Sequence, residues 1–123
     1  MKGFFQRILD IDLTNRTTEV KDLEEGLLRR YMGGKGLATH LLLERNSARV
    51  DSFAPDNQLV LALGPATDSA IYGSYRHDLF NKSPLTGFLG ESYYGGGFSG
   101  KTWKMVRKSQ KMRWEFLLRI TID

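Results

Sequence analysis

The chain has 123 residues, 41% of them hydrophobic and 26% charged, which is ordinary for one small globular domain and excludes disordered and collagen-like classes. Its net charge of +4 comes entirely from residues 101–123, where seven Lys and Arg face only two acids, so the charge alone does not indicate a nucleic-acid partner. The absence of cysteine excludes disulfides, thiolate catalysis and cysteine-bound zinc or iron–sulfur sites held by this chain alone.

The first segment, residues 4–21, predicts a β-hairpin, because apolar and polar residues alternate on both sides of a Thr-Asn-Arg-Thr turn. In its first strand, Asp10 and Asp12 are expected on the solvated face. The opposite, half-buried face is expected to carry the apolar residues Phe5, Leu9, Ile11 and Leu13.

Two helices are predicted after the hairpin. Apolar residues take helical spacing from Asp22, which is the expected N-cap, with Glu25 at the third helical position of a capping box. The pair Gly33–Gly34 should end this helix. A second helix is expected from Leu37 to about Arg45.

The rest of the first hundred residues predicts strands. Residues 59–63 are continuously apolar, which is typical of a strand buried on both faces. Residues 76–81 and 88–92 are expected to form two more strands, separated by a turn at 83–87 and followed by a glycine-rich loop at 95–100. Strands, then helices, then further strands predict an α+β fold rather than a doubly wound sheet.

The glycine-rich loop also matches a phosphate-binding pattern. Gly95–Thr102 fits G-x-x-x-x-G-K-[ST], in which Lys101 would reach a terminal phosphate and Thr102 a magnesium ion. However, a P-loop follows a buried parallel strand, whereas residues 88–92 include Gly, Glu and Ser, and only 21 residues follow Thr102. A small non-catalytic module that binds a nucleotide here, or nucleic acid through the basic segment, is the alternative hypothesis.

Among the charged residues, Arg76 is the candidate ligand-binding side chain. It lies between a loop and a strand, near the glycine-rich loop, and a guanidinium beside exposed backbone N–H groups suits an anion such as phosphate. An ordinary surface salt bridge is the competing interpretation. An empty site predicts an Arg76 that is partly exposed or paired with Asp78 or Glu91. His40 and His77 lack a second ligand at metal-binding spacing and are expected to be structural.

Five motifs occur in one order along residues 1–100. They are the N-terminal Met-Lys-Gly-Phe-Phe-Gln-Arg-Ile-Leu-Asp-Ile-Asp-Leu-Thr, Tyr31–Leu37 (Tyr-Met-Gly-Gly-Lys-Gly-Leu), Asn57–Pro65, Lys82–Gly87 (Lys-Ser-Pro-Leu-Thr-Gly) and the loop Gly95–Gly100. Together they closely resemble the N-terminal region of the aldehyde:ferredoxin oxidoreductases, the tungsten-pterin enzymes. The resemblance implies a β-α-β4 mixed sheet, the first repeat of a duplicated platform beneath the cofactor.

The same resemblance implies site residues. Arg76 matches an arginine that contacts the pterin phosphate, and Gly95, with its neighbours Gly96 and Gly97, matches a backbone contact to the tungstopterin (bis-pterin) cofactor. Tyr93 stands where well-known members place an asparagine that helps to hold a magnesium ion. Tyrosine is a poorer ligand for that hard cation, which puts magnesium binding in doubt.

The implied activity of an intact member is oxidation of aldehydes to carboxylates, with ferredoxin as electron acceptor and a [4Fe–4S] cluster bound by cysteines in later domains. This chain has no cysteine and is expected to bind cofactor without catalysing turnover alone. Its start lacks the apolar core of a signal peptide and no apolar run reaches membrane-spanning length, so we expect a cytoplasmic protein without membrane contact.

Residues 101–123 resemble nothing in the family and are expected to be a divergent, solvated basic tail. The predicted organisation is a partial family domain at 1–100 followed by this tail, from a truncated or frame-shifted reading frame or a short paralogue. Half of a duplicated platform would leave the apolar strand at 59–63 and the strand edges uncovered, which predicts self-association.

Overall fold

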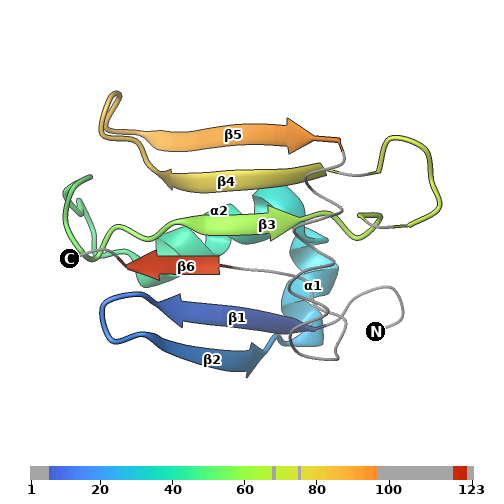
Figure 1. Cartoon of the computed structure of the whole chain (residues 1–123), viewed down its shortest axis with the longest axis horizontal. Helices are drawn as coiled ribbons and strands as arrows, with labels where there is room; N and C mark the ends of the chain where they lie inside the picture. Colours follow the sequence, from blue (N-terminus) through green and yellow to red (C-terminus); the bar gives the residue numbers. More distant parts are fainter. Residues whose placement is uncertain (1–5, 68, 75, 97–117, 122–123) are drawn as a thin grey trace.

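The strands form one layer and two helices cover one of its faces (Figure 1). The structure, a computed structural model, describes residues 6–67, 69–74, 76–96 and 118–121. It has a mixed α/β fold with the element order β1 (Arg7–Asp12), β2 (Thr17–Asp22), α1 (Glu25–Tyr31), α2 (Gly34–Arg45), β3 (Val60–Leu63), β4 (Arg76–Lys82), β5 (Leu89–Gly95) and β6 (Leu118–Thr121).

The layer consists of two three-stranded sheets, with strand orders β2-β1-β6 and β3-β4-β5. β1 pairs with β6 in parallel, and the other pairings are antiparallel. β6 lies beside β3 as well as β1, so the two sheets continue into each other (Figure 1). The expectation of a solvated tail is therefore wrong for residues 118–121, whose backbone groups pair with β1.

The predicted hairpin is confirmed, but its first strand faces the core with the opposite set of side chains. Ile8 and Asp10 are buried, Leu9 and Ile11 are half-buried, and Leu13 is exposed. Asp10 is buried because two cations meet it: Nη1 of Arg45 lies 2.6 Å from its Oδ1, and Nζ of Lys21 lies 2.8 Å from its Oδ2. The prediction of a solvated Asp10 is wrong because it considered the strand without these partners.

The first helix begins later than expected. Asp22 ends β2, where it pairs with Arg7 at 3.4 Å, and Glu24 is the N-cap of α1 without a side-chain capping bond. The helix ends just before the glycine pair, since Met32 takes a left-handed conformation and its N–H donates to the carbonyl of Leu28. The second helix begins at Gly34, earlier than the predicted start at Leu37. Within the described ranges, neither α1 nor α2 is long and apolar enough to cross a lipid bilayer.

The core lies between the helices and the covered face of the strand layer. Phe80 and Leu28 are completely buried, and Val60 and Ile8 are nearly so. Their neighbours from α2 and β3 are Leu37, Ala38, Leu41, Leu42 and Ala62. The apolar segment at 59–63 thus forms strand β3 as predicted, but Leu61 is only half-buried, so the strand is not completely buried on both faces.

Gly33 joins the two helices at a place that requires glycine. Its φ is +83°, and a Cβ there would lie 3.1 Å from the carbonyl oxygen of Leu63 at the end of β3. We expect Gly33→Ala to lower the free energy of unfolding by about 1–3 kcal/mol, because it adds both strain and a contact with backbone. Urea denaturation measures this change.

Gly26→Ala is the matched control, because Gly26 lies in α1 with open space around it. Alanine favours helix over glycine by roughly 0.5–1 kcal/mol, so this variant should be more stable than the wild type. Equal effects of the two substitutions would contradict the role assigned to Gly33.

Candidate functional site

The pairing of β4 with β5 places three of the predicted site residues together. Arg76 lies directly opposite Gly95, and Asp78 lies opposite Tyr93. Directly opposed residues of an antiparallel pair project from the same face of the sheet. Phe80, two positions beyond Asp78, is buried in the core, so this is the face that α1 and α2 cover.

The backbone of Arg76 is held at the start of β4, and its side chain is left exposed. Its N–H donates to the carbonyl of Ser74 at 2.9 Å, and its carbonyl accepts the hydroxyl of Thr67 at 3.1 Å. Among the described residues, no carboxylate lies within ion-pair distance of the guanidinium. Arg76 is thus exposed, one of the two expected states, and its five N–H donors can receive an anion.

Gly95 lies opposite Arg76 and Gly96 follows it, and because neither has a side chain, their backbone groups face the surroundings directly. Gly95 is the last residue of β5, and Gly96 follows with a φ of +86° and open space where a Cβ would be. Both are exposed. The register therefore brings Arg76 and Gly95 together, with Gly96 next to them, whereas Gly97 lies outside the described residues.

Tyr93 is part of a polar chain that runs from β5 to α2. Its hydroxyl donates to Oε2 of Glu91 at 3.0 Å, and Nζ of Lys35 lies 2.6 Å from the same oxygen. The hydrogen bonds from Lys35 and Tyr93 hold the pKa of Glu91 below its usual value. Partial burial, followed by the bond to Glu91, raises the pKa of Tyr93, so its hydroxyl stays protonated and directed at this carboxylate.

Of the two states expected for Arg76, the structure therefore has the exposed one. Glu91 pairs with Lys35 and not with Arg76, because it lies four residues before Gly95 on β5 and within reach of the first turn of α2. The sequence assigns no role to Lys35, since no local pattern indicates that the start of α2 lies against β5. A protonated phenol that donates to a carboxylate is a poor ligand for magnesium.

His77 and Asp78 follow Arg76 on β4. Asp78 lies on the same face of the strand as Arg76, and His77 lies on the opposite face. Burial raises the pKa of Asp78, although His77 and Arg76 oppose the change, and its Oδ1 is buried without a hydrogen-bond partner among the described residues. His77 is buried and stacks on Tyr94, with ring centroids 5.2 Å apart. Burial lowers the pKa of His77 below its usual value.

The lowered pKa of His77 predicts a pH dependence of stability. The unfolded chain takes up a proton near pH 6.5, before the buried imidazole does, so the free energy of unfolding should fall as the pH decreases below about 6.5. Urea midpoints at pH 7.5 and pH 5.5 measure this loss. His77→Phe keeps an aromatic ring against Tyr94 and should reduce the difference, whereas an unchanged difference would contradict the assignment.

The other candidate ligands have structural surroundings. His40 stacks on Tyr31 with centroids 4.8 Å apart and lies 3.7 Å from Glu44. In the part of the chain that the structure describes, no three His, Asp or Glu side chains gather as a metal site. The P-loop hypothesis is disfavoured because the strand before Gly96 is exposed and antiparallel, while Lys101 and Thr102 lie outside the described residues.

The sequence is similar to those of several curated proteins. The tungsten-containing aldehyde ferredoxin oxidoreductase of Pyrococcus furiosus is 34% identical over 101 residues, which cover 82% of this chain and 17% of that protein. The enzyme of the same name from Thermococcus kodakarensis is 32% identical over the same shares. The aliphatic sulfonate oxidoreductase, WOR-like subunit, of P. furiosus is 29% identical over 112 residues, 81% of this chain and 18% of that protein.

The fold has a solved counterpart. The active-site complex BamBC of benzoyl coenzyme A reductase, solved with 1,5-dienoyl-CoA, is similar with a TM-score of 0.79 and 23% identity, over 95% of this chain and 17% of that one. Residues 8–106 match the family described as aldehyde ferredoxin oxidoreductase, N-terminal domain. The chain spans about a sixth of its curated relatives, and it belongs to the aldehyde ferredoxin oxidoreductase N-terminal domain family, a family of oxidoreductases.

Proposed function

We propose that this chain is the cofactor-base domain of a tungstopterin oxidoreductase that oxidises aldehydes to carboxylates and passes the electrons to ferredoxin. In this proposal, Arg76 and the backbone at Gly95–Gly97 bind the phosphate of a pterin. The β1–β5 and α1–α2 unit of residues 1–100 is the first repeat of a duplicated platform, in place of the β-α-β4 order expected from the resemblance, and residues 101–123 are a divergent segment. The names of the curated relatives support the reaction and the electron acceptor.

The observation that carries the proposal is the register of β4 and β5. It sets an exposed guanidinium without an ion-pair partner, among the described residues, opposite the exposed Gly95, and a Cβ on the next residue, Gly96, would meet only open space. A phosphate is well bound by a planar fork of N–H donors together with backbone N–H groups. A carboxylate paired with the guanidinium would oppose phosphate binding. Glu91, the nearest candidate acid on β5, pairs with Lys35 instead.

The residues present fit one part of the cofactor and not another. Arg76 and Gly95 suit a phosphate, because they offer guanidinium and backbone N–H donors on opposed positions of β4 and β5. Tyr93 does not fit a magnesium-binding role, because its hydroxyl is engaged with Glu91 and its pKa is raised. When bound in the intact enzyme, the tungsten centre supplies the redox chemistry, while Arg76 and the glycine backbone hold and orient the pterin phosphate.

The whole reaction needs groups that this sequence does not contain. A cysteine-bound [4Fe–4S] cluster, the proposed exit for electrons, takes none of its ligands from this chain, which has no cysteine. We therefore assign cofactor binding, and not turnover, to residues 1–100.

The test is a fluorescence titration of the chain with a 6-substituted pterin phosphomonoester, compared with the same pterin lacking the phosphate. The phosphorylated ligand should bind at least tenfold more tightly, because only it engages the guanidinium. Arg76→Gln should remove this preference, since a hydrogen bond to a charged group contributes about 1.5–3 kcal/mol. Arg76 is exposed, so the variant should fold as the wild type does.

Arg30→Gln is the matched control, because Arg30 is an exposed arginine in the last turn of α1, away from β4 and β5. It should bind both pterins as the wild type does. Equal affinities for the two pterins, or an equal loss in the two variants, would contradict the proposed site.

A further inference from the structure

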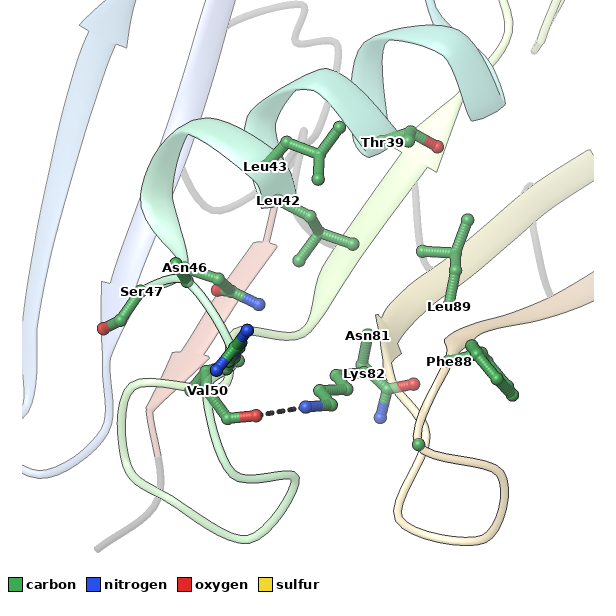
Figure 2. A pocket seen from close by; sticks show the side chains of 13 residues that line it. Thr39, Leu42, Leu43, Asn46, Ser47, Val50, Asn81, Lys82, Phe88 and Leu89 are labelled. Carbon is green, nitrogen blue, oxygen red and sulfur yellow. Dashed lines mark hydrogen bonds between the residues drawn. The ribbon is translucent and has the colours of Figure 1, made fainter.

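A hollow lies at the opposite end of β4 and β5 from Arg76. Its cavity volume is about 400 Å³, within the range of small-molecule sites. Arg76 begins β4 and Lys82 ends it, so the two ends are about 20 Å apart along the strand. In Figure 2 the last turns of α2 form one wall, with Leu42 and Leu43, while Phe88 and Leu89 form the other.

The walls of this groove are apolar and open to solvent. Leu43 is 79% exposed and Phe88 is 78% exposed, although both side chains border the same hollow. When a hydrocarbon group covers exposed leucine and phenylalanine side chains, apolar surface leaves water and the free energy of the complex falls. The groove therefore suits a ligand with an apolar body.

The charged residues that line the groove are both cations. Lys82 extends between the walls and donates from Nζ to the carbonyl of Val50 at 2.5 Å, as Figure 2 shows, which leaves two N–H donors on its ammonium group. Arg49 is the other cation, is exposed, and has no ion-pair partner among the described residues. Because none of the described residues that line the groove is an acid, it favours a ligand that carries negative charge.

The backbone at Arg49 has a left-handed conformation, which three other non-glycine residues of the described chain share. Its φ is +61°, in the turn that the N–H of Val50 closes by donating to the carbonyl of Ser47 at 3.0 Å. This left-handed conformation is uncommon for arginine and suits glycine better, so the arginine side chain is kept at a cost in backbone energy. Glycine at this position should therefore be tolerated without a loss of stability.

We propose that this groove binds an amphiphilic carboxylate, with a hydrocarbon body against Leu43 and Phe88 and its carboxylate between Lys82 and Arg49. This site is separate from Arg76 and does not depend on the proposed function.

The experiment titrates the full chain with octanoate, using octan-1-ol as the uncharged probe of the same chain length and following backbone amide NMR signals. Octanoate should bind with shifts centred on residues 43–50 and 82–89, and octanol at least tenfold more weakly. Arg49→Gly relieves the left-handed strain, so it should be at least as stable as the wild type and bind octanoate about tenfold more weakly. Phe88→Ala removes an exposed side chain and should weaken octanoate and octanol alike.

Arg16→Gly is the matched control, because Arg16 is also an exposed arginine with a positive φ, of +54°, in the β1–β2 turn. It should bind octanoate as the wild type does. Equal binding of octanol and octanoate, unchanged binding by Arg49→Gly, or an equal loss in Arg16→Gly would overturn the proposal. So would octanoate shifts that disappear on dilution together with a dimer seen by sedimentation, since a second copy of the chain would then fill the groove.

Discussion

Phe80→Ala is expected to lower the free energy of unfolding by about 3–5 kcal/mol, the usual cost of removing a buried phenylalanine side chain. Phe80 is completely buried, pairs with Val60 across β3 and β4, and meets Tyr93 edge-to-face with ring centroids 6.3 Å apart. The free energy of unfolding of a small domain is about 5–15 kcal/mol in total, so the variant should be largely unfolded in mild denaturant.

The measurement is urea denaturation followed by circular dichroism, with Phe53→Ala as control. Phe53 is 83% exposed, so its replacement should change stability by less than about 0.5 kcal/mol. If the two variants lost equal stability, the core assigned to the helix-covered face would be wrong.

Asp10→Asn is expected to cost about 3 kcal/mol, because it leaves two cations against a buried neutral amide. The side chain of Asp10 is only 8% exposed, and Arg45 and Lys21 hold it from α2 and β2. Burial alone would raise the pKa of Asp10, but the hydrogen bonds and charges of Lys21 and Arg45 outweigh it and lower that pKa. The stabilisation is thus present above pH 4 and is lost as the pH falls through the lowered pKa.

Glu19→Gln is the matched control, since Glu19 also pairs with Lys21, at 3.2 Å, but from an exposed position. Exposed ion pairs contribute about 0–1 kcal/mol. Denaturant midpoints at pH 7 should therefore separate the two variants, and their difference should shrink at pH 3. A difference that persisted unchanged at pH 3 would show that charge at Asp10 is not its cause.

Local patterns predicted the elements better than the faces they bury. The apolar run at 59–63 and the alternation at 76–81 are confirmed as β3 and β4, because burial of such short strands follows directly from their composition. The face of β1 was predicted wrongly because Arg45, the partner of Asp10, is 35 residues away. A buried carboxylate cannot be recognised until the cations that neutralise it are placed.

The candidate site shows the same limit. Arg76 and Gly95 were indicated separately, by anion chemistry and by family resemblance, but only strand register sets them opposite each other. The groove at Lys82 was not predicted, because its walls come from the end of α2 and from the β4–β5 turn. The left-handed conformation of Arg49, which lines this groove, also cannot be inferred from the sequence.

The most direct measurement of the central claim is a crystal structure of the chain bound to the pterin phosphomonoester. The phosphate should lie between the guanidinium of Arg76 and the backbone N–H groups at Gly95 and Gly96, within hydrogen-bond distance of both. A phosphate bound instead against Lys82 and Arg49, or along residues 101–123, with Arg76 directed away from it, would contradict the claim.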